Sequence, residues 1–126
     1  MKILLVDDEE SFREMMGDAL EARGYDVIRA EDGKQAREAM EMEQIDLIIS
    51  DVFMPTMDGA RFYSYVRDLS GANDVPFIFL SGYEDERVQK LVVDPAKDFY
   101  FRKTTPLEVI LTTIEKLNPA KSAGAP

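Results

Sequence analysis

Residues 46–59 read DLIISDVFMPTMDG, and this stretch decides the fold that the sequence predicts. Its apolar run continues from Leu47 to Ser50 and stops at an acid, Asp51. A short, nearly continuous run of Leu and Ile is typical of a strand that is buried on both faces in a parallel sheet. The segment from Ser50 onward begins a turn. The stretch therefore predicts a buried parallel strand with an acid at its end.

Apolar runs of this kind recur along the chain and alternate with helical patterns. The predicted strands are Ile3–Val6, Asp26–Ala30, Leu47–Ser50, Phe77–Leu80 and Phe99–Phe101. Apolar residues at helical spacing follow each of them, within Phe12–Leu20, Ala36–Met40, Phe62–Leu69, Val88–Val92 and Leu107–Leu117. A five-fold β-α alternation favours an α/β fold in which a parallel sheet has helices on both faces.

Two helical patterns give more detail. The first stripe predicts a buried face made of Phe12, Met15, Met16, Ala19 and Leu20. The last helix opens with TPLE, where Thr105 is placed to cap the helix and Pro106 occupies the first helical position. Glu108 would complete a capping box with Thr105.

The composition is that of an ordinary globular protein, with 45% hydrophobic and 32% charged residues among 126. We expect one domain over residues 1–118 and a flexible tail or linker start over residues 119–126, which are small and Pro-rich. No apolar run has the length of a membrane span, and no signal peptide is recognisable. The absence of Cys fits a cytoplasmic location.

The formal net charge of −10 restricts the partners. Phosphate backbones and anionic membrane surfaces should repel such a chain, so we expect no direct nucleic-acid binding and no membrane binding. The sequence also contains no His. This excludes an imidazole acid–base catalyst, a His metal ligand and a phosphohistidine within the chain.

Polar residues follow four of the predicted strands. Asp7 and Asp8 follow the first strand, Asp51 the third, Ser81 the fourth and Lys103 the fifth. Because parallel strands end at the same edge of a sheet, and open sheets bind ligands there, we expect these side chains to gather. Three carboxylates repel one another unless a cation lies among them, and oxygen ligands suit Mg²⁺ or Mn²⁺.

A site of this composition suits a phosphoryl group. The metal and Lys103 would neutralise charge on the phosphoryl oxygens, and the Ser81 hydroxyl could donate a hydrogen bond. One carboxylate would then be free to attack phosphorus and form an aspartyl phosphate. Glu9 and Glu10, in contrast, are placed to favour the positive N-terminal end of the first helix.

Four motifs together resemble a known family, the CheY-like receiver domain of two-component response regulators. They are LLVDDEES (4–11), DLIISDVFMPTMDG (46–59), PFIFLSG (76–82) and FYFRK (99–103). The resemblance extends from Lys2 to about Leu117. It implies a flavodoxin-like three-layer sandwich, with a five-stranded parallel sheet of order 2-1-3-4-5 and five helices on both faces.

The resemblance also implies a role for each site residue. Asp51 would be the phosphoacceptor. Asp8 and Asp51 would bind Mg²⁺ directly together with the backbone carbonyl of Phe53, while Asp7 would act through a water. Ser81 would hydrogen-bond to the phosphoryl group.

Three further positions complete the implied switch. Lys103 would pair with the phosphoryl oxygens, and Tyr100 matches the aromatic residue that turns inward when Ser81 moves. The rings of Phe53 and Tyr83, two residues after Asp51 and Ser81, suggest a hypothesis in which they screen attacking water and lengthen the phosphorylated lifetime.

In this family the phosphoryl group comes from a phosphohistidine on a sensor kinase or phosphotransfer protein. Because the sequence has no His, the donor must be another protein or domain. Phosphorylation would shift the face formed by the fourth helix, fifth strand and fifth helix. A downstream protein or a linked output domain would read that face, and a homodimer could form on it. Such a domain is a signalling domain and not an enzyme, and it catalyses only its own phosphorylation and dephosphorylation.

Departures from the family pattern leave one alternative open. The usual Lys-Pro is replaced by Lys103-Thr104, for which we expect a trans bond because a cis bond there would cost about 3–4 kcal/mol. A degenerate receiver that binds partners without phosphorylation is therefore the alternative. A haloacid-dehalogenase phosphatase would need an Asp where Phe53 stands, and a flavodoxin would need a phosphate-binding loop where the acids of residues 7–10 stand.

Overall fold

The computed structural model describes residues 1–52, 58–82, 90 and 94–118. Its five strands are β1 (Lys2–Val6), β2 (Asp26–Ala30), β3 (Leu47–Asp51), β4 (Phe77–Ser81) and β5 (Asp98–Arg102). The described residues form four helices: α1 (Glu10–Ala22), α2 (Gly33–Met42), α3 (Gly59–Asp68) and α5 (Leu107–Leu117). The fourth predicted helix, over Val88–Val92, lies outside the described residues apart from position 90.

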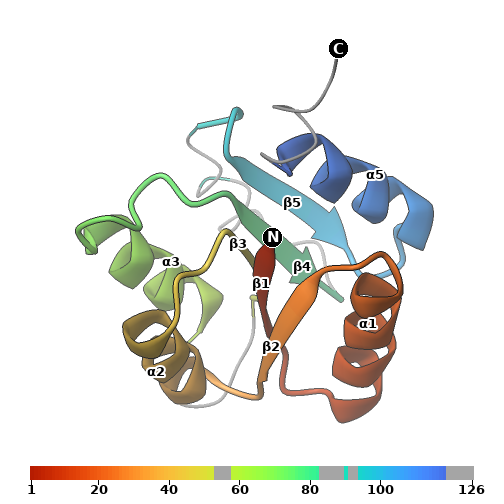
Figure 1. Cartoon of the computed structure of the whole chain (residues 1–126), viewed down its shortest axis with the longest axis horizontal. Helices are drawn as coiled ribbons and strands as arrows, with labels where there is room; N and C mark the ends of the chain where they lie inside the picture. Colours follow the sequence, from red (N-terminus) through yellow and green to blue (C-terminus); the bar gives the residue numbers. More distant parts are fainter. Residues whose placement is uncertain (53–57, 83–89, 91–93, 119–126) are drawn as a thin grey trace.

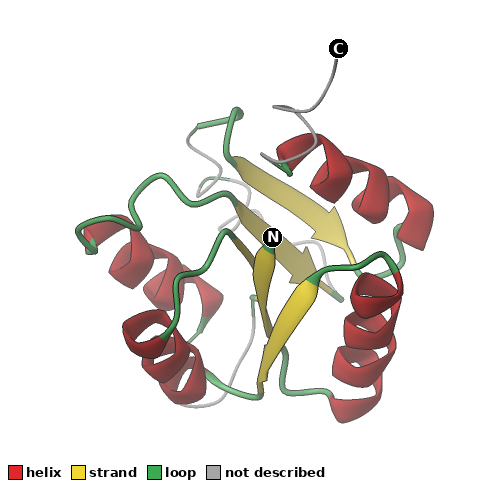
Figure 2. Cartoon of the chain, in the orientation of Figure 1, coloured by secondary structure: helices red, strands yellow, loops and turns green. Residues whose placement is uncertain are grey.

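All strand pairs are parallel and their order is β2-β1-β3-β4-β5, which confirms the predicted topology. β3 lies in the middle of the sheet with all five residues buried. The strands lie side by side in the centre of the molecule, with helices on either side of the sheet (Figure 2). None of the described helices has both the length and the apolar character needed to cross a membrane.

Alternate residues of the strands build two separate cores. Leu4, Val6 and Ile48 point to the side that α2 and α3 cover, where Phe62 and Val66 complete one cluster. Ile3, Leu5 and Ile49 point to the side that α1 and α5 cover. Figure 1 shows the two helix pairs on opposite faces of the sheet. Because successive side chains of a strand face opposite ways, a central strand that is buried on both faces must be apolar throughout.

The buried face of α1 differs from the predicted stripe at one position. Met15 is 47% exposed, whereas Met16 and Leu20 are buried. Gly17 is buried beside the Arg29 guanidinium, with which a Cβ at position 17 would clash. The missing side chain of Gly17 leaves space for Arg29, so the helix turns this side to the sheet and Met15 to solvent.

The start of α5 also differs from the prediction. Pro106 occupies the N-cap position and no side chain caps the helix, so the predicted capping box of Thr105 and Glu108 is wrong. The Thr105 N–H donates to the carbonyl of Arg102 at 2.9 Å and closes a turn after β5. Thr105 therefore belongs to this turn. The described residues contain no cis peptide bond, so the Lys103-Thr104 bond is trans as expected.

A buried charged cluster joins the start of β5 to α3. Asp98 is 1% exposed and its carboxylate accepts hydrogen bonds from the Tyr63 hydroxyl at 2.6 Å and from Arg67 Nη2 at 2.5 Å. Arg67 also donates to the carbonyl of Val75, just before β4. Hydrogen bonds of this kind are what a buried charge needs. The cluster fixes the end of the sheet that lies away from the predicted site.

Candidate functional site

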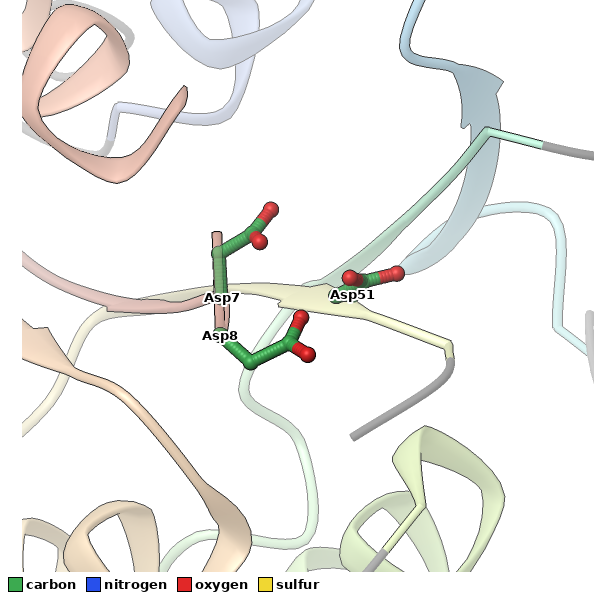
Figure 3. Close-up of side chains that lie close together, drawn as sticks. All are labelled: Asp7, Asp8 and Asp51. Atoms are coloured by element: carbon green, nitrogen blue, oxygen red, sulfur yellow. The ribbon is translucent and has the colours of Figure 1, made fainter. Parts of the chain in front are cut away.

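The fold gathers three of the predicted carboxylates at the carboxyl edge of the sheet. Asp7 and Asp8 follow β1 directly, and Asp51 is the last residue of β3. Carboxylate oxygens of the three residues, one from each, lie within 4.8 Å of one another. The close-up shows the side chains of Asp7 and Asp8 extending toward the end of β3, where Asp51 lies (Figure 3).

Lys103 follows β5 and brings an ammonium group to these acids. Its Nζ lies 2.8 Å from Asp7 Oδ2 and 3.2 Å from Asp51 Oδ2. A third carboxylate, Glu9 Oε2, lies 3.6 Å from the same Nζ. The ring centroid of Phe12 is 4.6 Å away. Lys103, which follows β5, thus contacts both the acid that follows β1 and the acid that ends β3.

Burial divides the three aspartates into two kinds. Asp7 is 1% exposed and Asp51 6% exposed, while Asp8 is exposed. A buried carboxylate needs compensation by a cation or by hydrogen bonds, which Lys103 supplies to Asp7 and Asp51. Asp8 gives the site an acid that solvent and solutes can reach.

The electrostatics keep Lys103 charged. Burial alone would lower the pKa of its ammonium group, but the carboxylates of Asp7 and Asp51 outweigh burial and raise it above the ordinary value. Burial raises the pKa of the Asp7 carboxyl, and the hydrogen bonds from Lys103 and from the Glu9 N–H offset this only in part. The cation is therefore firmly protonated near neutral pH, and burial disfavours the charged form of Asp7.

Short-range hydrogen bonds hold the ends of β1 and β3 in place. Asp7 Oδ1 accepts the N–H of Glu9 at 2.9 Å, and the Asp7 carbonyl accepts from Arg13 Nη1 at 2.7 Å. Beyond β3, the N–H of Gly59 donates to the carbonyl of Val52 at 2.7 Å. These bonds fix the backbone beside Asp7 and beside Asp51.

The two predicted switch residues lie on β4 and β5. Ser81 is the last residue of β4 and is fully buried; its carbonyl accepts the Lys103 N–H at 2.7 Å. Tyr100 pairs with Phe79 across the strands, is half-buried, and packs against the cluster under α2 and α3. Phe53 and Tyr83 lie outside the described residues.

The structure adds two residues that sequence reasoning did not place in the site. The sequence assigned Phe12 to the core and Glu9 to the helix start, and both also face Lys103. Their positions just after Asp7 and Asp8 are a weak signal at most. Their distance from Lys103 depends on how β1 and β5 sit in the finished sheet, which no local pattern contains.

As a chemical arrangement, the site combines nucleophilic carboxylates, a fixed ammonium and an accessible acid. Oxygen ligands of this kind suit a hard divalent cation. An ammonium and a cation beside a carboxylate can neutralise an incoming phosphoryl group.

Comparisons with known proteins agree with this arrangement. The sequence profile of the response regulator receiver domain matches residues 3–115. The sensor kinase CckA of Brucella abortus is 36% identical over 117 residues, which are 91% of this chain and 12% of the kinase. The alkaline phosphatase synthesis transcriptional regulatory protein PhoP of Bacillus subtilis is 38% identical over 86% of this chain and 45% of its own length.

Solved structures give the same result. Chemotaxis protein CheY4 of Vibrio cholerae has a TM-score of 0.83 at 31% identity, over 93% of this chain and 98% of that one. Response regulator TrrA of Thermotoga maritima, in a complex with Mg²⁺-BeF, has a TM-score of 0.80 at 28% identity, over the same shares of the two chains.

The extent of these matches differs between the two kinds of comparison. The chain spans between 12% and 52% of the length of the curated relatives it resembles, and nearly the whole of the solved receiver structures. With the profile matched over most of its length, the chain belongs to the family of receiver domains of two-component response regulators.

Proposed function

We propose that Asp51 is the phosphoacceptor of a two-component signalling switch. The observation that carries this proposal is the single ammonium of Lys103 between the carboxylates of Asp7 and Asp51, beside the exposed acid Asp8. A carboxylate that faces a fixed cation at an accessible sheet edge can receive a phosphoryl group whose charge the cation then neutralises.

The donor set fits Mg²⁺, with Mn²⁺ as the alternative. Asp8 and Asp51 would bind the ion directly with the backbone carbonyl of Phe53, and Asp7 would act through a water. The close approach of three carboxylates supports this, since their oxygens lie within 4.8 Å of one another and Lys103 is the one cation that the described residues place against them. When bound, the ion would supply positive charge for the phosphoryl oxygens.

The chain's own residues would then carry out the transfer. A carboxylate oxygen of Asp51 attacks phosphorus and forms the O–P bond, while the P–N bond to the donor imidazole breaks and its electron pair stays on nitrogen. Lys103 pairs with a phosphoryl oxygen in place of its present contact with Asp51. Ser81 donates its hydroxyl hydrogen to another oxygen, and Tyr100 turns inward as Ser81 moves.

The partners follow from this chemistry. The sequence has no His, so a phosphohistidine on a sensor kinase or phosphotransfer protein would be the donor. The output would be read from the face of the fourth helix, β5 and α5 by a downstream protein, a linked output domain or a second copy of the chain. Val109 of α5 is 47% exposed and is the residue we place in that contact.

The extent, location and turnover of the domain belong to the same proposal. Residues 1–118 would form the domain and residues 119–126 a tail or linker start. The location would be the cytoplasm, and no nucleic acid or membrane would bind directly. The chain would catalyse only its own phosphorylation and dephosphorylation.

Phe53 and Tyr83 would lengthen the phosphorylated lifetime. Phe53→Asn and Tyr83→Ala should therefore speed dephosphorylation. Unchanged dephosphorylation rates would contradict this role.

Intact mass measurement tests the central proposal. The protein is incubated with acetyl phosphate and Mg²⁺, and we expect one phosphate adduct. Asp51→Asn should abolish the adduct, while Asp68→Asn, which removes an exposed acid at the end of α3, should keep it. No adduct on the unmodified chain would favour the degenerate receiver that acts without phosphorylation.

A further inference from the structure

The ring of Phe12 faces the ammonium of Lys103. The Nζ atom lies 4.6 Å from the ring centroid, well inside the range of a cation–π contact. The Lys103 side chain is 15% exposed. Because the ammonium is mostly removed from water, the attraction to the ring face is stronger here than at an open surface.

The core fixes the position of the ring. Phe12 lies in the first turn of α1 and packs against the cluster under α1 and α5, whose members include Ile3, Leu5 and Met16. The helix begins at Glu10, two residues after Asp8, the second of the two acids that follow β1. The element that follows the carboxylates therefore also carries the ring, and Phe12 and Asp7 hold Lys103 as one unit.

The other contacts that the Lys103 ammonium makes with described residues are ionic. Its Nζ approaches Asp7, Asp51 and Glu9, and any of these carboxylates can draw the flexible side chain to itself. A phosphoryl group on Asp51 would remove one of these partners. The ring of Phe12 attracts the ammonium without competing as a charged acceptor, and phosphorylation of Asp51 would not remove the ring.

We infer that Phe12 is a positioning residue, which holds the Lys103 ammonium where the phosphoryl oxygens of Asp51 would need it. This inference rests on the function proposed above. The carboxylates and Ser81 would contact the metal or the phosphoryl group directly, whereas the ring of Phe12 would act only through Lys103. A residue that only filled the core would be replaceable by any apolar side chain of similar size, whereas a positioning ring must stay aromatic.

Nuclear magnetic resonance tests the contact without phosphorylation. In protein labelled with ¹³C-lysine, the ring current should move the Lys103 Hε resonances upfield of those of the other lysines. Phe12→Leu should abolish this shift and Phe12→Tyr should keep it. Lys103 Hε resonances at the position of the other lysines in the unmodified protein would overturn the inference.

Phosphorylation kinetics test the role. With acetyl phosphate and Mg²⁺, Phe12→Leu should lower the phosphorylation rate constant about fivefold, and Phe12→Tyr should restore it to within about twofold. Phe99→Leu is the matched control, because Phe99 packs against the same cluster from β5. It should lower the melting temperature as Phe12→Leu does and leave the rate constant within about twofold.

The outcomes separate the two proposals. An unmodified chain that takes up no phosphate overturns the proposed function, and the role of Phe12 with it. If the unmodified chain is phosphorylated and Phe12→Leu reacts equally fast, the role of Phe12 alone is wrong. Equal slowing of Phe12→Leu, Phe12→Tyr and Phe99→Leu would likewise overturn it, since that result would report core packing.

Discussion

Asp7, Asp8 and Asp51 differ in environment although they share one chemistry. Lys103 compensates the charge of Asp7 and Asp51, which are buried, whereas Asp8 is exposed. Like charges at this separation repel, and the repulsion is stronger where protein replaces water. The charge of Asp8 is the least compensated by the protein itself. Asp8 is therefore the residue that a cation from solution would stabilise most.

The first prediction compares two neighbouring acids. Asp8→Ala should weaken Mg²⁺ binding at least about tenfold, because it removes an oxygen ligand, while Glu10→Ala should change it less than about twofold. Glu10 lies in the first turn of α1 and is exposed. Isothermal titration calorimetry of both variants measures the affinities. Equal losses would mean that residues 7–10 act only as an acidic patch.

Sequence reasoning found the residues at the strand ends and missed those that reach the site from the side. Asp7, Asp8, Asp51 and Lys103 each directly follow or end a strand, so alternation alone predicts that they meet. Phe12 fits the apolar stripe of α1 equally well with or without Lys103 above its ring. Its second contact follows from tertiary packing, for which the sequence has no local marker.

At the scale of elements, the turn from β3 to α3 allows no side chain at Gly59. A Cβ there would lie 2.5 Å from the Asp51 carbonyl oxygen and 3.0 Å from the Cα of Val52. Both are backbone atoms, so a larger residue must push the end of β3 or the start of α3 aside. The close approach couples the position of α3 to that of the proposed phosphoacceptor.

The second prediction follows from this contact. Gly59→Ala should lower the free energy of unfolding by about 1–3 kcal/mol, the usual range for overpacking, and should slow phosphorylation by displacing Asp51. Gly82→Ala is the control after β4, where a Cβ would meet no atom of the described residues within 4 Å. Urea unfolding gives the stabilities. Equal, small effects of the two substitutions would contradict the close packing.

The third prediction concerns the cluster that joins β5 to α3. Asp98→Asn should destabilise the protein by about 3 kcal/mol at neutral pH, because it leaves Arg67 partly buried without its anion. Tyr63→Phe, which removes one neutral donor to the same carboxylate, should cost about 1 kcal/mol. Urea unfolding of both variants measures the difference.

The pH dependence of this effect has a definite sign. Burial alone would raise the pKa of Asp98, but the hydrogen bonds from Tyr63 and Arg67 outweigh burial and lower it below the ordinary value of 3.8. A lowered carboxyl pKa stabilises the fold above 3.8, and this stabilisation is lost as the pH falls through the folded-state value. The difference between wild type and Asp98→Asn should therefore shrink below about pH 4. A difference that grows in acid would contradict the assignment.

Buried polar residues explain where the predicted strands and the observed ones differ. The apolar pattern predicted that the third strand ends at Ser50, that the fourth ends at Leu80 and that the fifth begins at Phe99. In the structure each strand is one residue longer there, and includes Asp51, Ser81 and Asp98 respectively. Backbone pairing does not require an apolar side chain, and each of these three residues is buried. The strand ends were missed because the side chains there serve the site or the Arg67 cluster.

At the scale of the whole molecule, a net charge of −10 makes any added negative charge unfavourable. The carboxyl edge concentrates this effect, since three carboxylates lie together there. A divalent cation that binds only the folded state stabilises it by mass action, by about 2.7 kcal/mol at 100 times its dissociation constant. The three carboxylates should therefore lower the free energy of unfolding when no metal is bound. They should raise it when a divalent cation is bound.

The last prediction is a reversal of sign at Asp8. In EDTA, Asp8→Asn should be more stable than wild type by about 0.5–1 kcal/mol, because an exposed like charge is removed from beside Asp7 and Asp51. In saturating Mg²⁺, wild type should be the more stable protein, because the variant lacks an oxygen ligand. Thermal unfolding, with NaCl at matched ionic strength, measures both.

A distant substitution separates this site effect from the effect of total charge. Glu38→Gln removes one exposed negative charge from α2, so it should share any general gain in EDTA and show no reversal in Mg²⁺. If Asp8→Asn and Glu38→Gln behave alike under both conditions, the carboxyl edge is only part of a diffuse acidic surface. A reversal confined to Asp8→Asn would show that the cation acts at the place where the three strand-end acids meet.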